Sequence, residues 1–174
     1  KITKLDSEGH PLSGWVFNVD GPKRIPRTEP TDAEGVTIIP DLPSGTYKIS
    51  EEMDKGGWRQ ISGPTSTITF GSGEDKSVEF VNAKTGTLNI VKKDSAGAPL
   101  SGWSFRIEGP DTKTTGPTDV SGTITVTDLL PGEYAIQENL NSEWVNITPI
   151  RQRVALKPGE TTTVQFINDP LLNL

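Results

Sequence analysis

Hydrophobic and polar residues alternate in short runs along most of this 174-residue chain. Clear examples are WVFNV at residues 15–19, TYKIS at 46–50 and SVEFV at 77–81. Such runs have the period of two that is typical of a β-strand with one buried face, and no stretch shows the longer period of an amphipathic helix. Gly, Pro, Asp and Ser separate the runs at intervals of about 8 to 12 residues. The pattern predicts an all-β protein, built as a β-sandwich.

The same pattern occurs twice along the chain. The matching segments are KLDSEGHPLSGWVFNVDGP (4–22) with KKDSAGAPLSGWSFRIEGP (92–110), DLPSGTYKISEE (41–52) with DLLPGEYAIQEN (128–139), and VEFVN (78–82) with VQFIN (164–168). Each copy spans about 85 to 90 residues, which suits a small independent domain better than a solenoid repeat. We therefore predict two tandem sandwiches of about seven strands each, over residues 1–84 and 85–174.

Three apolar stripes in each copy end on a polar residue. The stripe on the first strand ends on a lysine, that on a middle strand on a glutamate, and that on the last strand on an asparagine. The residues are Lys4, Glu51 and Asn82 in the first copy, and Lys92, Glu138 and Asn168 in the second. In each case the polar residue lies two positions after a core-facing residue, so it shares the buried face of its strand.

This arrangement has two interpretations. In the first, the polar residues stand at strand ends with their heads in solvent, which is common for Lys, Glu and Asn. In the second, they form a buried cluster, in which burial favours a neutral lysine and a protonated glutamate. A neutral amine is a nucleophile, and a protonated glutamate beside an asparagine can polarise its carbonyl and transfer protons. The product would be a Lys–Asn isopeptide bond, formed with loss of ammonia.

Four motifs recur in both copies: K-x-D-x-x-G-x-P-L-x-G, TD-x-x-G, L-x-x-G-x-Y-x-I-x-E and F-x-N. Together they resemble the Cna B-type (SpaA-like, prealbumin-like) domains of Gram-positive surface adhesins and pilins, over nearly the whole chain. The resemblance implies two Ig-like or prealbumin-like β-sandwiches. It also implies specific site residues: an isopeptide bond from Lys4 to Asn82 with Glu51 as catalyst, and one from Lys92 to Asn168 with Glu138 as catalyst.

The resemblance also implies a function. We expect a structural stalk or shaft module of an extracellular adhesin, pilus or other cell-wall fibre, with neighbouring domains or subunits of the same fibre as partners. Two alternatives are a ligand-binding adhesin module for a host protein or glycan, and an accessory domain of a secreted enzyme. The cross-linking is a single-turnover, intramolecular reaction, so the chain is not expected to be an enzyme.

Four tryptophans depart from the usual pattern of this family: Trp15, Trp58, Trp103 and Trp144. Trp15 and Trp103 follow the L-x-G segment, and their spacing places them on the same face as Phe17 and Phe105. We therefore interpret them as core walls that shield the lysine. The alternative is a half-exposed tryptophan at a domain junction or binding surface.

Composition excludes several other functions. The net charge of −6 argues against nucleic acid as a partner, and no apolar run reaches the length of a membrane span. The chain has no cysteine and a single histidine, His10, so we expect no disulfide, no metal site and no cofactor.

Acidic loops such as DSEGHP lack the acid spacing of a calcium-binding loop and are interpreted as surface turns. The tripeptide at Asn146 fits a glycosylation acceptor, a pattern that is common by chance.

Overall fold

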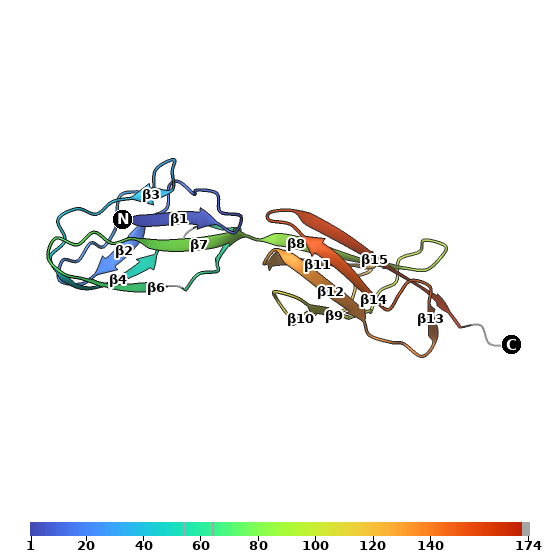
Figure 1. Cartoon of the computed structure of the whole chain (residues 1–174). Helices are drawn as coiled ribbons and strands as arrows, with labels where there is room; N and C mark the ends of the chain where they lie inside the picture. Colours follow the sequence, from blue (N-terminus) through green and yellow to red (C-terminus); the bar gives the residue numbers. More distant parts are fainter. Residues whose placement is uncertain (54, 64, 172–174) are drawn as a thin grey trace. The chain divides into compact units, whose positions relative to one another are not determined.

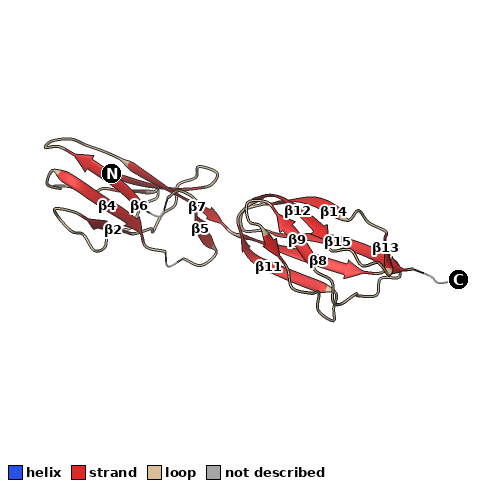
Figure 2. Cartoon of the chain, turned by 90° about the horizontal axis from the view of Figure 1, so that it is seen from below, coloured by secondary structure: helices blue, strands red, loops and turns tan. Residues whose placement is uncertain are grey.

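The computed structural model describes residues 1–53, 55–63 and 65–171. The chain divides into two compact units, Lys1–Lys84 and Thr85–Leu174, here called unit 1 and unit 2. Both consist of β-strands joined by loops, and no helix occurs in the described part of the chain (Figures 1 and 2). It follows that these residues include no helix long and apolar enough to cross a membrane. The predicted all-β class is confirmed.

The described residues of unit 1 form seven strands in two sheets. The strands are β1 (Ile2–Asp6), β2 (Phe17–Asp20), β3 (Val36–Thr37), β4 (Gly45–Glu51), β5 (Trp58–Gln60), β6 (Thr65–Phe70) and β7 (Val78–Lys84). One sheet has the order β3-β1-β7-β5, and the other has the order β2-β4-β6. The two sheets bury a common core, so the unit is a β-sandwich.

Unit 2 repeats this plan with eight strands over its described part, residues 85–171. They are β8 (Gly86–Lys93), β9 (Phe105–Glu108), β10 (Lys113–Thr114), β11 (Thr123–Leu129), β12 (Gly132–Glu138), β13 (Trp144–Asn146), β14 (Arg151–Leu156) and β15 (Thr161–Pro170). Its sheets have the orders β11-β8-β15-β13 and β10-β9-β12-β14. The extra strand is the short β10 at the edge of the second sheet, which pairs with β9 alone.

The first and last strands of each unit are parallel neighbours. β1 lies beside β7 (Figure 1). Lys4 is opposite Phe80, and Asp6 is opposite Asn82. β8 lies beside β15 in the same way, with Lys92 opposite Phe166. Residues at the two ends of the unit's sequence therefore meet at the centre of one sheet, at a register that the strand pairing sets.

The two sheets of each unit are held together by aromatic side chains at matching positions. In unit 1, Phe17 of β2 meets Phe80 of β7 across the sandwich, with ring centroids 4.9 Å apart. In unit 2, Phe105 of β9 meets Phe166 of β15 at the same distance of 4.9 Å. All four rings are almost completely buried. Full burial of an aromatic side chain contributes roughly 2 to 3 kcal/mol, so these pairs fix how the sheets face one another at the site.

Candidate functional site

The three sequence-predicted residues of unit 1 meet inside its sandwich. Lys4 is on β1 and Asn82 on the adjacent β7, while Glu51 ends β4 in the facing sheet. Lys4 and Asn82 are fully buried, and 9% of Glu51 is exposed. Phe17 of β2 is paired with Glu51 of β4, so the two side chains lie on the same, buried face of their sheet. This burial excludes the interpretation in which the three heads reach solvent.

Glu51 lies between the other two side chains. Its Oε2 is 3.7 Å from Lys4 Nζ, and its Oε1 accepts a hydrogen bond of 2.5 Å from Asn82 Nδ2. Lys4 Nζ also donates to the backbone carbonyls of Leu5 and Phe80, at 3.3 Å each. The carboxylate thus contacts both the amine and the amide nitrogen, which is the position needed to pass a proton from one to the other.

Unit 2 brings together its own predicted residues in the same way. Lys92 is fully buried, and Glu138 and Asn168 are each 1% exposed. Here a single oxygen contacts both partners: Oε1 of Glu138 is 3.4 Å from Lys92 Nζ and accepts a 2.8 Å hydrogen bond from Asn168 Nδ2. All six predicted site residues are therefore buried in two clusters of three.

Buried tryptophans cover the lysines. Trp15 and Trp103 are 2% and 7% exposed, so the core-wall interpretation is correct and the half-exposed alternative is wrong. Lys4 Nζ lies 4.7 Å from the centroid of the Trp15 ring, and Lys92 Nζ lies 4.3 Å from that of Trp103. A second tryptophan packs edge-on against each, Trp58 in unit 1 and Trp144 in unit 2. The rings exclude water from the amine while offering it a π-face.

Burial shifts the ionisation of the buried lysine–glutamate pair in each unit toward the neutral forms. It lowers the pKa of Lys4 from 10.5 to about 8, against the attraction of Glu51, which favours the charged amine. Burial likewise lowers the pKa of Lys92, against Glu138. The pKa values of Glu51 and Glu138 are raised by burial, with the lysine of the same unit acting in the opposite direction. Both carboxyls can therefore hold a proton at a pH at which an exposed carboxyl has lost it.

The sequence reasoning missed a fourth polar side chain in each unit. Gln60 of β5 is opposite Asn82, and Asn146 of β13 is opposite Asn168. Gln60 Nε2 donates to Glu51 Oε2 at 3.3 Å, and Asn146 Nδ2 donates to Glu138 Oε2 at 2.8 Å. The sequence segments WRQ (58–60) and WVN (144–146) contained the pattern that could have identified them, because each amide lies two residues after a core-facing tryptophan. Because the Asn146 amide nitrogen is hydrogen-bonded inside the site, this fold leaves it unavailable as a glycosylation acceptor.

The TD-x-x-G motif supports the lysine strand. Gly35 accepts a hydrogen bond of 2.7 Å from Lys4 N, and Gly122 accepts one of 2.7 Å from Lys92 N. Both glycines have a φ of 71°, and a β-carbon on either would overlap the carbonyl oxygen of that lysine. Glycine is therefore required for both the close approach and the left-handed backbone.

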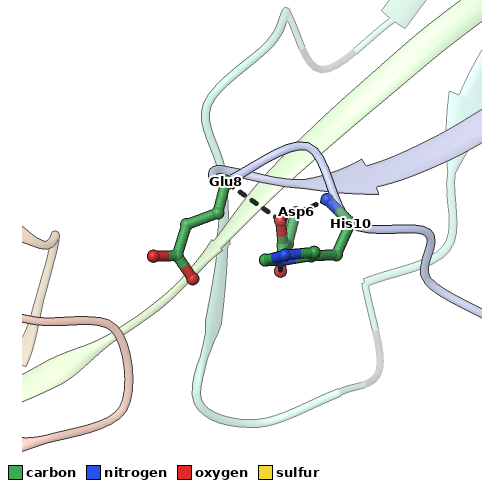
Figure 3. Close-up of side chains that lie close together, drawn as sticks. All are labelled: Asp6, Glu8 and His10. Carbon is green, nitrogen blue, oxygen red and sulfur yellow. Dashed lines mark hydrogen bonds and ion pairs between the residues drawn. The ribbon is translucent and has the colours of Figure 1, made fainter.

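One group of potential metal ligands occurs among the described residues. Asp6, Glu8 and His10 offer ligand atoms within 4.8 Å of one another (Figure 3). Asp6 Oδ1 accepts hydrogen bonds from the backbone nitrogens of Glu8 and His10, at 2.8 Å each, which closes a turn. Asp94 makes the equivalent 2.8 Å bond to Ala98 N in unit 2. The turn thus forms without the histidine, and in unit 1 His10 Nδ1 also lies 3.1 Å from Asp6 Oδ2.

The chain is similar to known proteins in two comparisons, one with solved structures and one with protein families. No curated protein matches the sequence significantly. Among solved structures, the Bacillus anthracis TIE protein is 25% identical with a TM-score of 0.48; the match covers 95% of this chain and 33% of that one. The chain therefore spans about a third of the length of that protein.

Two pilins of similar length also match. GBS52, the minor pilin of Streptococcus agalactiae, is 17% identical with a TM-score of 0.43, and the match covers 99% of this chain and 97% of that one. BcpA, the major pilin subunit of Bacillus cereus, is 11% identical with a TM-score of 0.41, covering 98% of each chain.

The family is established by the sequence itself. The SpaA family, described as a prealbumin-like fold domain, matches residues 1–84 and again residues 86–170. The two matches cover nearly all of the chain and correspond to the two sandwiches. The chain therefore belongs to the SpaA prealbumin-like fold domain family, which it contains in two tandem copies.

Proposed function

We propose that each unit cross-links itself through an isopeptide bond, from Lys4 to Asn82 in unit 1 and from Lys92 to Asn168 in unit 2. The cross-linked units would serve as a structural stalk or shaft segment of an extracellular adhesin, pilus or cell-wall fibre. The observation that carries the proposal is the completely buried lysine beside a buried glutamate and asparagine, found in both units.

The chemistry needs only the groups in the cluster. A proton passes from the lysine ammonium to the glutamate, which leaves a neutral amine and a carboxylic acid. The amine nitrogen attacks Cγ of the asparagine, and the Cγ–Nδ2 bond breaks as the acid protonates Nδ2. Ammonia leaves, and the glutamate recovers the second proton lost by the amine. The sheltered site favours the neutral reactants, and no cofactor is required.

The position of the bond gives it a mechanical role. Force along a tandem of domains enters unit 1 near the N-terminal end of β1 and leaves near the C-terminal end of β7. Because these strands are parallel neighbours, such force would shear all of their hydrogen bonds together. A covalent bond between Lys4 and Asn82 would carry the force past the rest of the sandwich. It would also be independent of redox conditions, which suits a chain without cysteine.

Single-molecule stretching of the whole chain tests this role. Without a cross-link, each unfolded unit would extend by roughly 75 to 80 residues at about 3.5 Å each, or about 270 Å. We expect no such extension in the wild-type chain, and two in a chain carrying both Glu51→Gln and Glu138→Gln. Two long extensions in the wild-type chain would overturn the proposal.

A further inference from the structure

The asparagine carbonyl has different surroundings in the two units. In unit 2, Asn146 Nδ2 donates one hydrogen to Glu138 Oε2 at 2.8 Å and one to Asn168 Oδ1 at 3.3 Å. A primary amide nitrogen carries two hydrogens, so both are used inside the site. The amide of Asn146 is thus aimed at the carbonyl oxygen of the residue that would be attacked.

Unit 1 lacks this contact. Gln60 has the equivalent place on the neighbouring strand, but its Nε2 donates to Glu51 Oε2 and to the backbone carbonyl of Gly63, at 3.3 Å each. Within the described residues, the buried Oδ1 of Asn82 has no hydrogen-bond partner. The contact to the glutamate is therefore common to both units, and the contact to the asparagine carbonyl occurs in unit 2.

This difference bears on the reaction, because negative charge develops on the carbonyl oxygen when an amine attacks an amide. A donor already directed at that oxygen stabilises the charge without reorganisation. The donor also orients the amide, since the reverse orientation of Asn168 would place its NH₂ group against that of Asn146. In the observed orientation the leaving nitrogen, Asn168 Nδ2, donates to Glu138 Oε1, which is also 3.4 Å from Lys92 Nζ.

We infer that Asn146 is a catalytic residue of unit 2: its amide stabilises the oxyanion on Asn168 Oδ1, so unit 2 forms its cross-link faster than unit 1. This inference rests on the proposed function. The bond formed is Lys92 Nζ–Asn168 Cγ, the bond broken is Asn168 Cγ–Nδ2, and Glu138 carries the proton to the departing ammonia. Asn146 exchanges no proton and contributes its hydrogen bond alone.

The rates of the two units can be measured separately in the full chain. With Lys4→Ala, unit 2 alone can lose ammonia; with Lys92→Ala, unit 1 alone can do so. Each chain is synthesised in a short cell-free pulse and quenched in denaturant at timed intervals. The readout is the fraction of chains lighter by about 17 Da, which is one ammonia. We expect the reaction to be faster in the Lys4→Ala chain.

Exchanging the two amides is the decisive comparison. Asn146→Gln keeps a donor for Glu138 but gives unit 2 the side chain of unit 1, and Asn146→Asp keeps the shape but removes both donors. We expect each to slow unit 2, by about 100-fold for the loss of an oxyanion donor. The reciprocal Gln60→Asn should speed unit 1. Asn139→Ala, which removes an exposed amide bonded to Ser104 Oγ, is the matched control and should have no effect.

The pH profile separates this role from a purely structural one. Loss of the contact to Glu138 would move the pH optimum, because that hydrogen bond helps to lower the pKa of Glu138 against the effect of burial. Loss of the oxyanion contact lowers the maximum rate instead, and this is the result that we expect for Asn146→Gln. Unchanged rates in both Asn146 variants, with the bond still forming, would overturn this inference alone. Failure of both parent chains to lose ammonia would overturn the proposed function together with it.

Discussion

Units 1 and 2 place a lysine, a glutamate and an asparagine on equivalent strands, β1, β4 and β7 in unit 1 and β8, β12 and β15 in unit 2. The surroundings of these side chains differ in two respects. The first is the amide beside the glutamate, which reaches the asparagine carbonyl in unit 2 and does not reach it in unit 1. The second is the side chain that lies over the tryptophan beside the lysine, which is Trp15 in unit 1 and Trp103 in unit 2. In unit 1, Lys55 Nζ lies 4.7 Å from the centroid of the Trp15 ring and donates to Ser13 O at 3.4 Å.

Unit 2 has a serine, Ser142, four residues after its glutamate, where unit 1 has Lys55. A cavity of about 600 Å³ opens here in unit 2, and its lining includes Ser142, Trp103 and Trp144. Strand register brings the lysine and asparagine strands together in both units, and the packing of the two sheets brings the glutamate to them. The amide on the neighbouring strand, Gln60 or Asn146, then determines whether the asparagine carbonyl is contacted, and the side chain beside the tryptophan differs between Lys55 and Ser142.

Removing the carboxyl proposed as catalyst, in one unit at a time, should have the largest effect. We expect Glu51→Gln to abolish the bond of unit 1 alone, and Glu138→Gln that of unit 2 alone. The two rings are of similar length, so each loss should cost about 4.5 kcal/mol of unfolding free energy by loop entropy. Calorimetry of the full chain, with a separate transition for each unit, measures this.

Glu52→Gln is the matched control for that experiment. Glu52 follows Glu51 in sequence but forms an exposed ion pair with Arg27, which contributes less than about 1 kcal/mol. A similar loss in Glu52→Gln and Glu51→Gln would contradict the assignment of the catalytic carboxyl.

The pH dependence of stability should distinguish cross-linked from uncross-linked units. In Asn82→Ala, Lys4 remains a free amine whose proton is released near pH 8 when folded and near pH 10.5 when unfolded. Between these values the unfolded chain binds more protons, so the stability of unit 1 should rise with pH, by on the order of 3 kcal/mol. If the proposed bond has formed in the wild-type chain, the Lys4 nitrogen is an amide nitrogen and has no such titration. Denaturant unfolding at pH 7.5 and at about pH 10 compares the two; a parallel rise in both chains would show that Lys4 is free in the wild type.

The smallest effect should come from exchanging Lys55 and Ser142, the residues at equivalent positions near Trp15 and Trp103. Lys55→Ser removes a cation from the Trp15 ring and should destabilise unit 1 by about 0.5 to 1 kcal/mol. Ser142→Lys supplies one near Trp103 and should stabilise unit 2 by a similar amount. Thermal unfolding of the two variants gives both values, and shifts of the same sign would refute the equivalence of the two positions.

Much of the site could be predicted from the alternation of residues. A period of two places Lys4, Glu51 and Asn82 on buried faces, and a duplicated sequence repeats the inference for unit 2. Pairing the lysine with the asparagine depended instead on the family resemblance, because no local pattern indicates that β1 and β7 are parallel neighbours. Pairing at this distance in sequence is a property of the whole topology.

Gln60 and Asn146 show where sequence reasoning stopped. Their strands are three residues long, too short for a period to be recognised, and their importance depends on register with the last strand. The difference of one methylene between the two side chains is visible in the sequence. Its effect on the carbonyl contact depends on distances of a few tenths of an ångström, which only packed side chains define.

The most direct test of the central claim is the intact mass of the denatured wild-type chain. The proposed bonds predict a mass lower than that of the sequence by about 34 Da, the mass of two ammonias. Relative to the masses of their own sequences, Lys4→Ala and Lys92→Ala should each show a deficit of about 17 Da. A wild-type mass equal to that of the sequence would contradict the account, and would leave two buried Lys–Glu–Asn clusters that do not react.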